Sequence, residues 1–126
     1  MTAADLLGAI EEEGPRAAID VYRKQWKERG TPPVAENALN TAGYLLLFSG
    51  RQKEGLELLQ MNVEAYPSSS NAYDSLGDAY LAIGEREKAL EATKKAAALL
   101  GTETGLTPER RAAIQGSIDG KLKQLE

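Results

Sequence analysis

The chain has 126 residues, a length typical of one domain, and 42% of them are hydrophobic and 27% charged. Fifteen Lys and Arg against nineteen Asp and Glu give a net charge of −4, which argues against a general nucleic-acid binder. The absence of Cys and His excludes disulfides, thiolate metal sites and Cys nucleophiles, and removes the commonest general base. We therefore expect no cofactor, no metal and no catalytic activity.

The sequence shows no sign of a membrane partner. No stretch approaches the ~20 apolar residues that a membrane span needs. The first residues, Met1 to Asp5, lack the basic start and the apolar run of a signal peptide. We expect a cytoplasmic protein, or a periplasmic one if the sequence is a domain of an exported protein.

The spacing of apolar residues is helical along nearly the whole chain. No segment shows the sustained alternation of a strand, and short loops rich in Gly, Pro and Ser separate the helical stretches. Loops this short force consecutive helices to pack antiparallel. The pattern predicts an all-α chain of about seven helices, at residues 3–13, 15–29, 33–48, 52–66, 70–83, 86–100 and 108–125.

A repeat becomes visible when the sequence is shifted by 34 residues. The shift aligns identical residues: Asn37 with Asn71, Ala38 with Ala72, Gly43 with Gly77, Leu47 with Leu81, Gly50 with Gly84 and Leu56 with Leu90. The second copy carries Tyr73, Leu76, Gly77, Tyr80 and Ala89 in the order of the tetratricopeptide signature, so the chain resembles that repeat family. The first copy matches less fully, and in the second copy Thr93 and Gly101 replace the late aromatic and the Pro of the signature.

The resemblance implies helical hairpins stacked as a right-handed superhelix in a single domain, residues 1–126. Residues 3–35 would be a degenerate first repeat, 36–69 and 70–103 two repeats, and 107–126 a capping helix. Gly43 and Gly77 fall inside helices, where Gly costs roughly 1 kcal/mol relative to Ala. We expect a neighbouring helix to pass too close for a Cβ there, whereas in a generic helical bundle these glycines would be accidental.

The last predicted helix departs from the repeat. Its apolar face carries Ile114, Ile118, Leu122 and Leu125, and we expect Glu109, Arg110, Arg111, Lys121 and Lys123 on its polar face. Repeat arrays end in an element that covers the last apolar face, so we predict a cap. The alternative is a homodimer seam, because Gly116 and Gly120 permit close approach. The chain would then be a monomer or a weak homodimer.

In the tetratricopeptide family the first helices of successive repeats line a groove that binds peptides. Carried over by position, that groove contains Asn37, Asn40, Tyr44 and Phe48 from one repeat and Asn71, Asp74, Ser75 and Asp78 from the next. Asn side chains can bond a peptide backbone, and the absence of Lys and Arg argues against the carboxylate clamp of chaperone-binding members. The two Asp favour a basic or polar segment of a protein or peptide, unless they are simply solvated charges.

Two further interpretations concern the chain's role. Residues 62–80 resemble the repeat tails of some bacterial serine hydrolases of β-lactamase-like type, which would make the chain an accessory or scaffold domain. No Ser-x-x-Lys or Gly-x-Ser-x-Gly motif occurs. The basic residues of the second helix are spread around it, so a solvated face is expected there, and no nucleic-acid partner: Arg16, Arg23, Lys24, Lys27 and Arg29.

Overall fold

The structure is a computed structural model that describes residues 2–126. This part of the chain contains seven α-helices and no strand, which confirms the predicted all-α fold. The helices form two compact units, Met1–Ala65 (unit 1) and Tyr66–Glu126 (unit 2), and each unit is described by itself. No helix within residues 2–126 combines the length and apolar character needed to span a bilayer.

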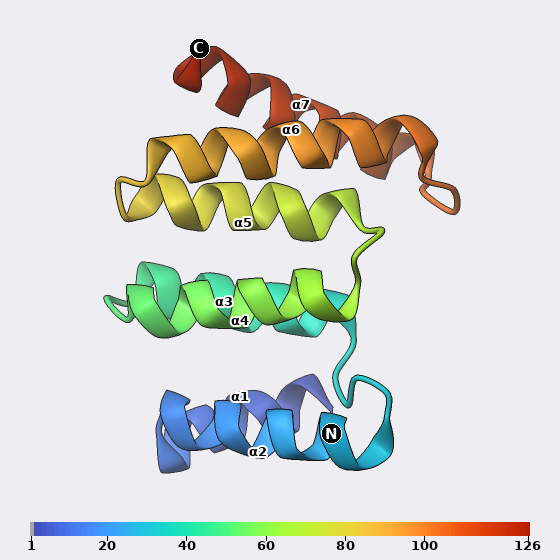
Figure 1. Cartoon of the computed structure of the whole chain (residues 1–126). Helices are drawn as coiled ribbons and strands as arrows, with labels where there is room; N and C mark the ends of the chain where they lie inside the picture. The colour runs from blue at the N-terminus through green and yellow to red at the C-terminus, as the bar shows by residue number, and fades with distance from the viewer. Residues whose placement is uncertain (1) are drawn as a thin grey trace. The chain divides into compact units, whose positions relative to one another are not determined.

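Unit 1 consists of two helical hairpins (Figure 1). Its helices are α1 (Ala3–Glu13), α2 (Pro15–Arg29), α3 (Glu36–Phe48) and α4 (Gln52–Ala65). α1 packs on α2 and α3 on α4, and the hairpins meet through α1 against α3 and α2 against α4. The predicted start of α3 was about three residues early, because Ala35 is still extended, with φ −66° and ψ 156°.

Unit 1 is held by a dry core and by ion pairs between α2 and α4. Arg16 donates two hydrogen bonds to the Glu57 carboxylate at 2.8 and 2.6 Å, and Arg23 lies 3.8 Å from Glu57 and 3.6 Å from Glu64. The Arg16 guanidinium lowers the pKa of Glu57 below its ordinary value. Two of the basic residues expected to form a solvated face therefore join the two hairpins. The fully buried side chains of this unit include Leu6, Ile19, Tyr22, Leu39, Leu58, Leu59 and Met61.

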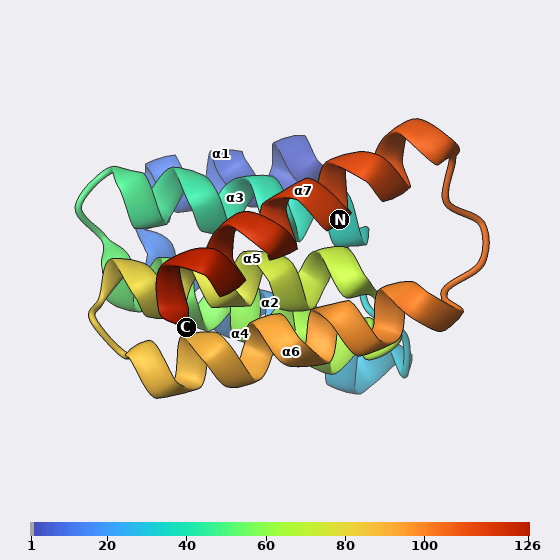
Figure 2. The same ribbon diagram turned by 90° about the horizontal axis from the view of Figure 1, so that it is seen from above.

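Unit 2 contains the hairpin of α5 (Ser70–Ala82) and α6 (Arg86–Thr102), with α7 (Pro108–Leu125) packed against both helices (Figure 2). α5 begins after Ser69, whose hydroxyl accepts a hydrogen bond from the N–H of Ala72 at 3.1 Å. α7 begins as predicted, with Thr107 as the N-cap and Pro108 as its first residue.

Gly43 and Gly77, inside α3 and α5, sit at close helix contacts, as predicted. An ideal Cβ on Gly43 would lie 2.7 Å from Leu59 Cγ and Cδ2, and one on Gly77 would lie 2.7 Å from Thr93 Oγ1. At Gly55 the obstacle is backbone, because a Cβ would lie 2.6 Å from the amide nitrogen of Leu47. A Cβ therefore meets a neighbouring helix in both hairpins, and at Gly55 the atoms that it meets are main chain.

α7 covers the end of unit 2. Ile114 and Ile118 are 5% and 0% exposed, and they form a core cluster with Ala96 and Leu100 of α6. Arg111 donates to the carbonyl oxygens of Leu100 and Glu103, which orients α7 at the end of α6. Of the apolar face predicted for this helix, Ile114 and Ile118 are thus buried within unit 2, and Leu122 and Leu125 are half-buried.

One residue of α7 lies on the opposite face from the one expected. Lys121 was assigned to the polar face, but it is only 5% exposed. Its place seven residues after Ile114 puts it on the buried stripe, since seven residues are close to two helical turns. The assignment of Lys121 to the solvated face was therefore wrong.

Candidate functional site

The most prominent exposed apolar surface of unit 1 lies on α3. Side chains spaced three or four residues apart line one side of a helix, and Asn37, Asn40, Tyr44 and Phe48 follow this spacing. We call these four residues the α3 face. The rings of Tyr44 and Phe48 stack, with centroids 5.8 Å apart and planes inclined by 8°. Phe48 is 74% exposed and neighbouring Leu45 is 55% exposed, which is unusual for such large apolar side chains.

Two clefts adjoin the α3 face. The first, of about 460 Å³, is lined by Asn40, Thr41, Tyr44, Leu45, Phe48 and Ser49. The second, of about 750 Å³, lies between α1 and α3 and is lined by Leu7, Ile10, Glu11, Ala42, Leu45, Leu46, Ser49 and Arg51. Both include Leu45 and Ser49, so the clefts are neighbours. The sequence did not predict the second cleft, because it depends on the packing of one hairpin against another.

The polar groups of the α3 face differ in their surroundings. Asn37 is exposed, and its main-chain carbonyl oxygen accepts a hydrogen bond from the Thr41 hydroxyl at 2.9 Å. The Oδ1 atom of Asn40 is buried and has no hydrogen-bond partner within residues 2–126. A buried acceptor without a donor is uncommon.

The predicted site residues of α5 are in a different environment. Asp74 and Ser75 are 5% and 2% exposed, whereas Asn71 and Asp78 are half-buried. The ammonium nitrogen of Lys121 lies 2.8 Å from Asp74 Oδ1 and 2.9 Å from Asp78 Oδ1. It also donates to Ser117 at 2.8 Å. The basic group that these carboxylates attract is thus supplied by α7 of the same chain.

The acidic side chains of the described part of the chain do not form a cluster of metal ligands. Within residues 2–126, no group of three or more acidic side chains converges on a point where a metal ion could bind. The carboxylates of Asp74 and Asp78, one helical turn apart on α5, are bridged by Lys121. Glu11, Glu12 and Glu13 are exposed at the end of α1, as expected for a polar helix end.

Comparisons with known proteins identify the fold and nothing finer. No protein-family model and no curated protein sequence matches the chain. Among solved structures, it is similar to the Sgt2 TPR domain from Aspergillus fumigatus, with a TM-score of 0.58 and 19% sequence identity. The match covers 98% of this chain and 76% of that one. The fold is therefore an all-α, tetratricopeptide-like helical repeat, while the resemblance to the tails of bacterial serine hydrolases is unconfirmed.

Proposed function

We propose that the chain is a protein–protein interaction module that binds a peptide or protein segment on the α3 face. The observation that carries the proposal is the exposed stack of Tyr44 and Phe48 beside two clefts. A large exposed aromatic surface on a helix is typical of a binding site, because a ligand that covers it removes apolar surface from water, which is favourable.

The side chains on α3 make two kinds of contact with the ligand, apolar packing and hydrogen bonds. An apolar side chain of the ligand packs against Phe48 and Leu45 and enters the neighbouring cleft. Asn37 and Asn40 bond the ligand's backbone through their amide groups. Backbone bonds hold a segment without reading its sequence, so the apolar side chain supplies the selectivity.

The proposed site is smaller than the one that the sequence suggested. Asp74 and Ser75 are left out because both are buried. Asn71 and Asp78 stay as half-buried candidates on α5. Lys121 forms an ion pair with Asp78 and so offsets its negative charge, which weakens the attraction for a strongly basic ligand. A polar segment with an apolar anchor fits the site better.

The proposed organisation follows the repeat. α1–α2 form a degenerate first repeat, α3–α4 and α5–α6 the two regular repeats, and α7 the cap. The close contacts at Gly43 and Gly77, which are 34 residues apart, support the register of the two repeats. An accessory or scaffold role beside a hydrolase is supported only by the sequence of residues 62–80; co-purification of the chain with a serine hydrolase from its native source tests it.

A peptide selection tests the binding proposal. Peptides are selected from a displayed random library on the full chain, and their affinities are measured by fluorescence anisotropy. Phe48→Ala and Tyr44→Ala should each weaken the selected peptides at least about tenfold, as truncation of a central aromatic contact does. Val21→Ala is the matched control, because it removes another exposed apolar side chain, 38% exposed, from unit 1. Equal affinity in all four proteins rejects the α3 face as the site.

Homodimerisation through α7 is the alternative, and the burial of Ile114 and Ile118 argues against it. A seam between two copies would need this stripe exposed, yet it packs on α6. Light scattering on the full chain should therefore give the mass of a monomer at micromolar concentration. A dimer that persists on dilution would restore the alternative.

A further inference from the structure

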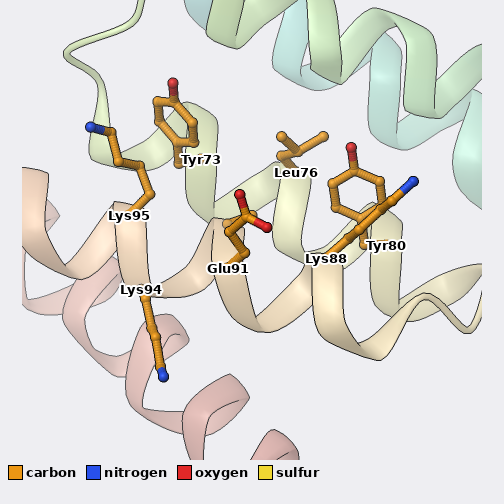
Figure 3. Close-up of a pocket in the computed structure, with 8 residues that line it drawn as sticks. Tyr73, Leu76, Tyr80, Lys88, Glu91, Lys94 and Lys95 are labelled. Carbon is orange, nitrogen blue, oxygen red and sulfur yellow. The ribbon is translucent and has the colours of Figure 1, made fainter.

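Unit 2 has a pocket that the proposed function does not use. It has a volume of about 660 Å³, within the range of about 300–1,000 Å³ that is common for ligand pockets. Leu76 and Ala92, each 6% exposed, form its floor. The half-buried rings of Tyr73 and Tyr80 stand at its two ends, with their hydroxyl groups pointing the same way (Figure 3). The pocket therefore offers an apolar base between two aromatic walls.

The rim of the pocket is charged. α6 contributes Lys88, Glu91 and Lys95 to it, at a spacing that keeps all three on one side of the helix. Lys95 extends beside Tyr73, and Lys88 lies over Tyr80, 5.9 Å from the ring centroid (Figure 3). No ion pair within residues 2–126 involves either of these lysines. In a chain of net charge −4, the rim is thus a local excess of unpaired positive charge.

The equivalent surface of the first regular repeat has a different character. A shift of 34 residues places Leu39, Leu46 and Met61 where unit 2 has Tyr73, Tyr80 and Lys95. The three apolar residues are 0%, 5% and 0% exposed, on helices that pack against α1 and α2. Their replacements carry hydroxyl and ammonium groups, and Lys95 is exposed. At these positions the second copy therefore has groups that are able to hydrogen-bond to a polar ligand, where the first copy has buried apolar side chains.

We propose that this pocket binds an acidic peptide segment. An apolar or aromatic side chain of the segment enters between Tyr73 and Tyr80, and carboxylates on either side of it pair with Lys88 and Lys95. The Glu91 carboxylate, between the two lysines, accepts a backbone N–H of the segment. Its negative charge in the middle of the rim disfavours continuous polyanions such as nucleic acids, which would place a phosphate there.

The dimensions of the rim fit this ligand. Seven helical residues separate Lys88 from Lys95, a rise of about 10.5 Å. Acidic residues three apart lie about 9 Å from each other on one side of a polyproline II segment. Flexible lysine side chains make up the difference. The ligand class is thus a short segment with two acidic residues three positions apart and an apolar residue between them.

Anisotropy titration of a labelled peptide containing Glu-Ser-Phe-Glu, flanked by Gly and Ser, tests the proposal on the full chain. The peptide should bind with a Kd of about 1 mM or tighter, and the Kd should increase with salt concentration. Lys88→Glu and Lys95→Glu should each weaken it at least tenfold. Lys123→Glu is the matched control, since it makes the same change of net charge in unit 2, but Lys123 is exposed on α7 and is not among the residues that line the pocket. It should change the affinity less than twofold.

Several outcomes would overturn the proposal. They are no binding of the acidic peptide, equal effects of all three charge reversals, and tighter binding of the matching Lys-Ser-Phe-Lys peptide or of an oligothymidine. Phe48→Ala separates this site from the α3 face, because it should leave the acidic peptide's affinity unchanged. Loss of binding in Phe48→Ala alone would place the peptide on the α3 face and reject the pocket.

Discussion

The hairpins α3–α4 of unit 1 and α5–α6 of unit 2 are copies of one sequence pattern, and their equivalent surfaces make different contacts. Tyr44 and Asp78 occupy the same repeat position. Tyr44 stacks on a largely exposed Phe48, whereas Asp78 and the more deeply buried Asp74 are bound by Lys121. The same position therefore lies in an aromatic stack in one hairpin and is ion-paired to α7 in the other.

The two hairpins also differ in how closely their helices pack. Gly55 of α4 corresponds to Ala89 of α6. A Cβ at Gly55 would lie within 3.0 Å of three backbone atoms of α3, whereas unit 2 buries the methyl group of Ala89 completely. At this position unit 1 has a close main-chain contact, and the side chain of any residue larger than Gly would clash with it.

The largest effect should come from breaking the anchor of unit 2. Lys121→Met leaves Asp74 buried without its cation, and removing one partner of a buried pair typically costs about 3–5 kcal/mol. Hydrogen exchange should be faster throughout α5–α7. Trp26 is the only Trp in the chain and lies in unit 1, so an unfolding transition followed by Trp fluorescence reports on that unit.

Two further variants show whether charge is the cause. Adding Asp74→Asn to Lys121→Met removes the stranded carboxylate and should recover a large part of the lost stability. Arg110→Met removes an exposed cation from the same helix and should change stability by less than about 0.5 kcal/mol. A loss as large for Arg110→Met as for Lys121→Met would contradict the anchor.

The next largest effect should appear at the close contact of unit 1. Gly55→Ala places a methyl group 2.6 Å from the Leu47 nitrogen and 2.8 Å from the Gly43 oxygen, and overpacking of this kind costs about 1–3 kcal/mol. The helices must move apart, because neither obstacle is a flexible side chain. Urea unfolding followed by Trp26 fluorescence measures the loss.

Gly8→Ala in α1 is the matched control for this substitution. No atom lies within 4 Å of a Cβ at Gly8, so the better helix propensity of Ala should stabilise unit 1 by about 0.5–1 kcal/mol. Replacing Gly by Ala should therefore lower the stability of unit 1 at Gly55 and raise it at Gly8. In unit 2, Ala89→Gly should cost about 1 kcal/mol or more. Equal signs for Gly55→Ala and Gly8→Ala would show that packing does not determine the effect.

Sequence reasoning predicted the helices and the close glycine contacts because both depend on local spacing. It placed Lys121 in solvent because a Lys is almost always exposed, although its position seven residues after Ile114 indicated the buried face. Its partners, Asp74 and Asp78, are more than forty residues away, and no local pattern connects them. The cleft between α1 and α3 could not be predicted for the same reason, since two hairpins form it.

A smaller effect should come from acid, and it concerns the α2–α4 contact. Arg16 lowers the pKa of Glu57 below its ordinary value of 4.5. A carboxylate whose pKa is depressed in the folded state stabilises that state above its unfolded value, and the contribution disappears as the pH falls through the folded pKa. The pair is partly exposed, so it contributes at most about 1 kcal/mol, present above pH 4.5 and lost below it.

Arg16→Gln isolates this contribution. At pH 7 the variant should be less stable than the parent chain by up to about 1 kcal/mol, and the difference should shrink as the pH falls below 4.5. Trp26 fluorescence during urea unfolding at each pH measures both proteins. A difference that stays constant down to pH 3 would mean that the guanidinium contributes by packing and not through the Glu57 charge.

The smallest effect on stability should come from Phe48→Ala. Phe48 is 74% exposed, so its truncation removes little buried area, and the better helix propensity of Ala offsets part of the lost stacking on Tyr44. We expect a change of less than about 0.5 kcal/mol in urea unfolding. Leu46→Ala on the same helix is the contrast, because Leu46 is 5% exposed and should cost about 2–5 kcal/mol. A cost at Phe48 similar to that at Leu46 would mean that the aromatic stack supports the fold, and unit 1 would then lose the distinction from unit 2 on which its proposed binding role depends.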